Sequence, residues 1–193
     1  EVETIREMTL RATEEIRHVM FKLRPLVLES RGLGAALEQL AEKMEKTYNQ
    51  PMKTYTEQVV ENYLDVNQQG AIFYLIEEAA NNARKYAQAS MIRASVTMQE
   101  DTIVVKIVDN GKGFNVEEVA GGYDERGSFG MVNMRERAEL LDGMLDLKSV
   151  PGRGTQITAF IPIPRGKPAA KSVPDTPSHI PRSKLSLAAL EKN

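Results

Sequence analysis

The sequence has no cysteine and no tryptophan, and only two of its 193 residues are histidine. Without cysteine the chain forms no disulfide and no thiolate metal site, which is compatible with a reducing compartment. No signal peptide is expected from these residues, and no apolar run approaches the roughly 18 residues that a membrane-spanning helix needs. Its 25 Lys and Arg against 27 Asp and Glu leave a net charge of -2, so no basic surface for nucleic acid is expected. These absences predict a cytoplasmic domain without direct contact with nucleic acid or membrane, although a longer protein around it can be soluble or membrane-anchored.

Hydrophobic residues make up 41% of the chain, enough for one domain with a sizeable core and appendages. Helical spacing of apolar residues predicts helices over 35–48, 68–87 and from after Gly130 to Leu141. The face of the second helix expected to be buried comprises Ile72, Leu75, Ile76, Ala79, Ala80 and Ala83. Runs rich in β-branched residues predict strands over 53–60, 91–99, 102–109, 144–150 and 155–161. The predicted fold class is α/β, a two-layer sandwich in which three helices lie on one face of a mixed sheet.

The end of the second predicted helix carries three polar side chains at helical spacing. Glu78 and Asn82 are four residues apart, and Asn82 and Lys85 three apart, so all three can project from one face. An amide oxygen suits Mg2+, which prefers oxygen ligands, while an ammonium suits phosphate and a carboxylate can order a water molecule. The alternative is a solvated polar stripe, as found on any amphipathic helix.

A second motif follows the strand predicted over residues 102–108, which runs directly into Asp109-Asn110-Gly111-Lys112-Gly113-Phe114. Asp109 is thus held at a strand end, where its carboxylate can accept a hydrogen bond from an exocyclic amine such as that of adenine. The glycines at 111 and 113 allow the backbone to approach a flat ligand closely. A plain hairpin turn would use similar residues. No strand-like run follows Phe114, which favours a nucleotide pocket.

A second glycine cluster, Gly127-Ser128-Phe129-Gly130, completes a set of ordered motifs. Together with the helix ending in Glu78 to Tyr86 and the turn from Asp109, it resembles the N box and glycine boxes of histidine-kinase catalytic domains of the GHKL ATPase superfamily. The likeness is closer to nitrate-sensor and desaturase-regulator kinases, through Leu23-Arg24-Pro25 followed by Gly32-Leu33, and through Gly130-Met131-Val132-Asn133-Met134-Arg135-Glu136-Arg137-Ala138. It covers roughly residues 15–163.

The resemblance implies a Bergerat-type ATP-binding fold with ATP and Mg2+ as cofactors. Asn82 would be the Mg2+ ligand, with Glu78 and Lys85 beside it as the other catalytic residues, and Asp109 would recognise the adenine amine. Residues 115–126 would form a mobile ATP lid, ended by the second glycine cluster, which leads into a helix whose N-terminal amides face phosphate. Thr155 resembles a threonine near the adenine-binding aspartate, or is an ordinary strand residue after a turn. The implied ATP contacts are Asn82, Lys85, Tyr86, Asp109, Gly111, Gly113, Phe114, Gly127, Ser128, Gly130, Met131, Val132 and Thr155.

The resemblance also divides the chain into three parts. Residues 1–30 look like the second helix of a dimerisation and phosphotransfer hairpin, which Pro25 would kink or end. Residues 31–164 form the catalytic domain, and the proline-punctuated residues 165–193 are expected to be a disordered tail. His18 is followed by Val-Met-Phe rather than by an acidic residue, so we interpret it as a structural or surface histidine. The phospho-accepting histidine is therefore expected outside this chain.

The implied function is transfer of the ATP γ-phosphoryl group to that histidine and then to an aspartate of a response regulator, often a helix-turn-helix transcription factor in this branch. The full protein would be a homodimer joined through its N-terminal helices. Two alternatives stay open: a nucleotide-binding scaffold without kinase activity, and a GHKL serine kinase of the anti-sigma type. The helix ending in Leu23-Arg24-Pro25 favours the histidine kinase, because a serine kinase needs no dimerisation hairpin.

Overall fold

The computed structural model of the chain describes residues 25–117 and 125–163. Over residues 125–129 it describes the backbone alone. The predicted hairpin helix up to residue 24 with His18, the central part of the predicted lid and the predicted tail lie outside the described residues.

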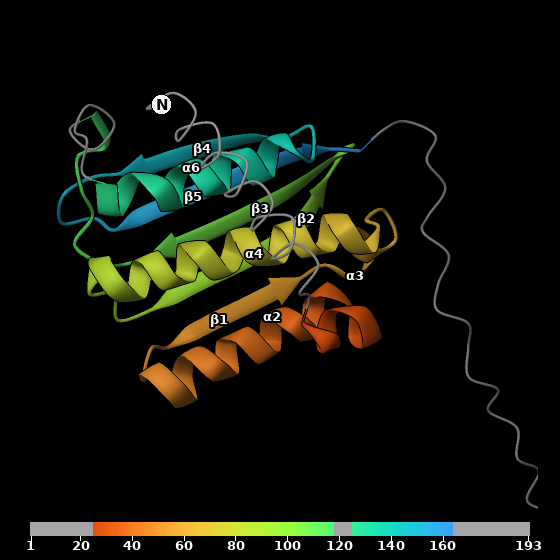
Figure 1. Ribbon diagram of the computed structural model, residues 1–193, viewed down its shortest axis with the longest axis horizontal. Coiled ribbons are helices and arrows are strands. Elements are labelled where there is room, and N and C mark those ends of the chain that lie inside the picture. Colours follow the sequence, from red (N-terminus) through yellow and green to blue (C-terminus); the bar gives the residue numbers. More distant parts are fainter. Residues whose placement is uncertain (1–24, 118–124, 164–193) are drawn as a thin grey trace, which may run out of the picture.

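A five-stranded sheet with the order β1-β2-β3-β5-β4 forms one layer of the molecule (Figure 1). Strands β1 and β2 are parallel, whereas every other neighbouring pair is antiparallel. The strands are β1 Met52–Thr56, β2 Ile92–Gln99, β3 Thr102–Asp109, β4 Met144–Ser149 and β5 Thr155–Pro162. The prediction of a mixed sheet is therefore confirmed.

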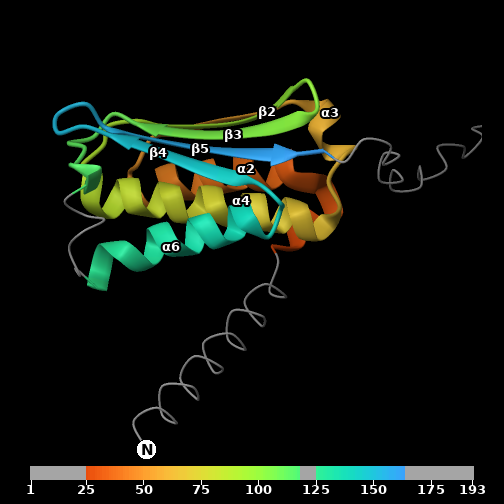
Figure 2. The ribbon, with the colours of Figure 1, turned by 90° about the horizontal axis from the view of Figure 1, so that it is seen from above.

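The helices form the second layer. Figure 2 shows α2, α4 and α6 together on one face of the sheet, as predicted for a two-layer sandwich. Helix α4 runs without a break into a π-helical turn, η1. The helices are α2 Leu26–Tyr48, α3 Gln58–Glu61, α4 Val66–Asn82, η1 Ala83–Ala87 and α6 Glu125–Glu139.

Helix α4 is fixed at its start by a capping box and along its length by burial. The Asp65 carboxylate accepts hydrogen bonds from the backbone N–H groups of Asn67 and Gln68, and the Gln68 side chain accepts one from the Asp65 N–H. Ile72, Leu75 and Ile76 are fully buried, and the other members of the predicted buried face are also buried. The helix thus lies in the core between the sheet, α2 and α6.

The strand predicted over 53–60 is wrong in its second half, because the chain leaves the sheet after Thr56 and forms α3. Glu57 ends the pairing: its N–H donates to the Val96 carbonyl, and its own carboxylate then accepts the N–H of Met98. The Glu57 carboxylate thus accepts the β2 N–H group that a backbone carbonyl of a longer β1 strand would otherwise accept. Val60 is completely buried, so its β-branched side chain packs into the core from helix α3 rather than from a strand.

Helix α6 begins at Glu125, so the second glycine cluster lies within the helix, which corrects the prediction that the cluster precedes it. Helix α2 begins at Leu26, earlier than the predicted Ala35, but Gly32 interrupts it with a φ of 81°. Glu61 accepts the Gly34 N–H at 2.8 Å and so caps the part of the helix after the break. Leu28, before the break, is 2% exposed and belongs to the same core. The proposed boundary near residue 30 stays a prediction.

Candidate nucleotide-binding site

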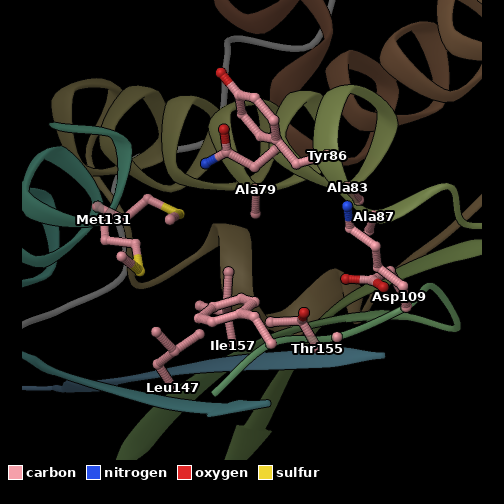
Figure 3. Close-up of a pocket in the computed structure, with 14 residues that line it drawn as sticks. Ala79, Ala83, Tyr86, Ala87, Asp109, Met131, Leu147, Thr155 and Ile157 are labelled. Atoms are coloured by element: carbon pink, nitrogen blue, oxygen red, sulfur yellow. The ribbon is translucent and has the colours of Figure 1, made fainter. Parts of the chain in front are cut away.

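A cavity of about 380 Å³ opens between the helix layer and one end of the sheet (Figure 3). It is mostly apolar, with a few polar side chains. Its walls come from α4 and η1, from the turn after β3, from α6 and from the β4 and β5 strands. The lining residues are Ala79, Asn82, Ala83, Tyr86, Ala87, Asp109, Lys112, Gly113, Phe114, Met131, Met134, Leu147, Thr155 and Ile157.

The wall formed by α4 and η1 consists mainly of alanines, at positions 79, 83 and 87. Their small side chains leave room for a flat ligand between the helix and the sheet. Tyr86 lies at the edge of the cavity with half of its surface exposed. A π-helical turn carries one more residue than an α-helical turn, and such turns occur frequently at functional sites.

Asp109 is the buried acid of the cavity. It ends β3, is 7% exposed and points into the cavity (Figure 3). One carboxylate oxygen accepts the Gly111 N–H at 2.8 Å. A carboxylate can accept about four hydrogen bonds, so Asp109 keeps acceptor capacity for a ligand.

The turn after β3 needs glycines because its backbone lies against the backbone of neighbouring segments. A Cβ atom on Gly111 would collide with the carbonyl oxygen of Ala87, which also accepts the Lys112 N–H at 2.8 Å. Gly113 has a φ of +60°, and a Cβ atom there would collide with the carbonyl oxygen of Val150. The turn is therefore pressed between η1 and the hairpin that follows β4, and it holds Asp109 at the cavity.

Glu78 and Asn82 meet at α6. A Cβ atom on Gly130 would lie 2.5 Å from Glu78 Oε1 and 2.9 Å from Asn82 Nδ2, so the glycine lets the two helices approach there. Further along α6 the Arg137 guanidinium lies 5.1 Å from the centre of the Tyr74 ring. Burial lowers the pKa of Arg137 from its ordinary value, and the nearby Glu78 carboxylate opposes this shift.

Seven of the predicted site residues, catalytic and ATP-binding together, line the cavity, whereas five described ones do not. The seven are Asn82, Tyr86, Asp109, Gly113, Phe114, Met131 and Thr155. The five are Glu78, Lys85, Gly111, Gly130 and Val132. Lys85 is exposed on η1, and its phosphate contact stays a prediction. Residues 127 and 128 are described in their backbone only, so the predicted ligand contacts of Gly127 and Ser128 stay predictions.

Half of the lining residues were not predicted from the sequence. Met134, Leu147 and Ile157 fit apolar patterns that indicate only a core, so no signal distinguished them. Ala79 and Ala83 were assigned to a buried face, which is where a cavity wall also lies. Lys112 could have been predicted as a lining residue, because it stands between the two glycines of the first glycine motif. It brings a cationic side chain to the cavity.

A mixed sheet covered on one face by helices, with a buried carboxylate beside a cavity between the layers, defines an α/β sandwich of the nucleotide-binding kind. Residues 67–165, about half of the chain, match the family model of histidine kinase-, DNA gyrase B- and HSP90-like ATPases. The chain belongs to this ATPase family, as an ATP-binding domain of the sensor-histidine-kinase type.

Relatives support this assignment. An uncharacterized sensor-like histidine kinase of Chloroflexus aurantiacus is 37% identical over 165 residues, which are 84% of this chain and 28% of that protein. The sensor histidine kinase LiaS of Bacillus subtilis is 28% identical over 162 residues, 84% of this chain and 43% of LiaS. The chain thus spans less than half the length of these relatives.

A solved structure supports the fold. The blue-light activated histidine kinase of Erythrobacter litoralis superposes with a TM-score of 0.55 at 20% identity, over 68% of this chain and 42% of that one. Among the helices of the described residues, none has the length and apolarity to span a bilayer.

Proposed function

We propose that this chain binds Mg2+-ATP in the cavity and is the phosphoryl-donating domain of a sensor histidine kinase. The observation that carries the proposal is Asp109, a carboxylate buried in a mostly apolar cavity with acceptor capacity left over. A buried carboxylate whose hydrogen-bonding capacity is only partly filled is costly, so Asp109, which accepts the Gly111 N–H, favours a ligand that donates further hydrogen bonds. The exocyclic amine of adenine is such a donor.

The phosphates would extend from the adenine end of the cavity towards Asn82 and the N-terminal part of α6. Glu78 and Asn82 converge on Gly130 there, which supports their assignment to the phosphate end. Backbone N–H groups in the first turn of α6, including that of Gly127, would face the phosphates. Lys85, exposed on η1, would reach them from the solvent side.

The donor set fits Mg2+. Among the side chains described in residues 25–117 and 130–163, no three acidic or histidine groups gather into a cluster that could hold a metal ion. Mg2+ usually takes one or two protein ligands, several waters and the oxygens of substrate phosphates. The Asn82 amide oxygen would be that protein ligand, and the bound ion would neutralise charge on the transferred phosphoryl group.

The reaction partners would lie in the rest of the protein and beyond it. We propose residues 1–30 as the second helix of a dimerisation hairpin, 31–164 as the catalytic domain and 165–193 as a tail. The phosphoryl group would pass to a histidine outside this chain and then to an aspartate of a response regulator, including those of the helix-turn-helix type. Catalysis would rest on positioning of the γ-phosphoryl group and neutralisation of its charge.

The metal assignment is tested by titrating the chain with ATP, with and without Mg2+, in Asn82→Ala. We expect Asn82→Ala to weaken binding with Mg2+ more than binding without it. Asn81→Ala is the matched control, because Asn81 is the neighbouring half-buried asparagine and does not line the cavity. Equal losses with and without Mg2+ would contradict the assignment of Asn82.

The transfer reaction is tested on the longer protein that includes the upstream hairpin, incubated with γ-labelled ATP. Label that is lost in acid but stable in alkali indicates phosphohistidine and supports the proposal. Acid-stable label would indicate a serine kinase instead. ATP binding without any label would indicate the nucleotide-binding scaffold.

A further inference from the structure

Ser149, at the end of β4, joins three segments of the cavity wall through one hydroxyl group. Its Oγ accepts the N–H of Phe114 at 2.9 Å and donates to the Gly154 carbonyl oxygen at 3.0 Å. It also lies 3.1 Å from the hydroxyl oxygen of Thr155. Ser149 itself does not line the cavity, whereas Phe114 and Thr155 do.

The protons of this cluster can be assigned by counting. A serine hydroxyl has one proton and two lone pairs, and a carbonyl oxygen can only accept. The proton of Ser149 therefore goes to Gly154, and one lone pair takes the N–H of Phe114. The remaining lone pair must take the proton of Thr155. Thr155 is thus left with acceptor lone pairs alone for a ligand in the cavity.

Thr155 lies beside Asp109, because the two residues are partners in the antiparallel register of β3 and β5. Their oxygens face the cavity together (Figure 3). One oxygen of Asp109 is already bonded to the Gly111 N–H. This part of the wall therefore presents neighbouring hydrogen-bond acceptors and no donor from either side chain.

We propose that Ser149 is a positioning residue that fixes the base preference of the cavity, by holding the Thr155 hydroxyl as an acceptor. The proposal rests on the proposed nucleotide-binding function. A purine with a 6-amino group brings donor hydrogens to the two acceptors. A purine with a 6-oxo group places an acceptor at position 6 and carries its donor on N1 instead. The buried oxygen that faces position 6 is then left without a donor, which disfavours this base.

The experiment compares Mg2+-ATP with Mg2+-ITP, whose bases differ at position 6, by titration calorimetry of the whole chain. Ser149→Ala frees the Thr155 proton, which can then turn towards the base. We expect the ratio of ITP to ATP dissociation constants to fall about tenfold, with ATP binding weakened and ITP binding strengthened. Ser149→Thr keeps the hydroxyl and should keep the wild-type ratio.

Two further variants separate this effect from general damage. Thr155→Val removes the acceptor without supplying a donor, so ATP binding should weaken while ITP binding does not improve. Ser95→Ala, in β2 on the face of the sheet away from the helices, should leave both affinities unchanged. Thermal unfolding of every variant reports whether it is folded, and if Ser149→Ala does not fold, Ser149→Thr and Thr155→Val decide the question.

A wild-type ratio in Ser149→Ala, or in Thr155→Val, would overturn the role of Ser149. An altered ratio in Ser149→Thr would do the same. Absence of ATP binding by the wild-type chain would instead refute the proposed function on which the inference rests. The two failures are therefore distinguishable in one set of titrations.

Discussion

Gly130→Ala should separate stability from nucleotide binding. The new methyl group would lie 2.5 Å from Glu78 Oε1 and 2.9 Å from Asn82 Nδ2, closer than the 3.0 Å that real Cβ contacts respect. Both atoms are ends of flexible side chains, so these two side chains move aside rather than the backbone. Alanine within a helix is favoured over glycine by about 0.8–1.0 kcal/mol, which offsets this rearrangement. The free energy of unfolding should therefore change by less than about 1 kcal/mol.

Binding of Mg2+-ATP should respond differently, because the displaced groups are the proposed Mg2+ ligand and its neighbouring acid. Losing one polar contact to the bound nucleotide or its Mg2+ costs about 1–3 kcal/mol, so binding should weaken about tenfold or more. Titration calorimetry measures the affinity, and denaturant unfolding measures the stability.

Gly34→Ala is the matched control for this experiment. Gly34 also lies within a helix, and a Cβ atom there would meet its nearest neighbour, Glu61 Oε1, at 3.4 Å. We expect a small gain in stability from helix propensity and unchanged ATP affinity. Wild-type ATP affinity in Gly130→Ala would refute the reasoning that places the phosphate end of the ligand between α4 and α6.

Three further substitutions test the packing that holds the cavity. Gly113→Ala combines a φ of +60° with a collision against the Val150 carbonyl, and should lower the free energy of unfolding more than Gly152→Ala, where the φ is +81° but no atom lies within 4 Å; equal losses in denaturant unfolding would contradict this. Ile76→Ala removes a fully buried side chain and should cost about 2–5 kcal/mol in the same assay, and a loss below about 1 kcal/mol would show that the core around α4 is not close-packed. Asp65→Ala removes the N-cap of α4 and should cost about 1 kcal/mol, whereas Asp65→Asn should cost less; identical melting temperatures for Asp65→Ala and the wild type would exclude a stabilising cap.

Much of the fold could be predicted from local patterns. Strand β3 has the predicted bounds, Thr102–Asp109, because an almost uninterrupted β-branched and apolar run is buried at the centre of the sheet. The buried face of α4 was also predicted correctly, since a helix between two layers must turn its apolar side towards the core. The position of Asp109 at the cavity follows from the end of that strand.

The features that could not be predicted depend on contacts between distant parts of the chain. Nothing local in residues 57–61 shows that Glu57 will bond to Met98 and end strand β1. Lys85 would share a face with Asn82 at α-helical spacing, whereas the chain forms a π-helical turn there. The contact of Ser149 with Phe114 could not be predicted, because the two residues are far apart in the sequence and meet only in the folded chain.

The most direct test of the account is calorimetric titration of this chain with ATP, with and without Mg2+, beside Asp109→Asn. The asparagine oxygen can still accept the Gly111 N–H, so the turn is preserved, but its NH2 group faces the amine of the base with a second donor. The account predicts micromolar to millimolar binding by the wild type, weakened by one to two powers of ten in the variant. Unchanged affinity in Asp109→Asn, or no binding by the folded wild-type chain, would contradict it.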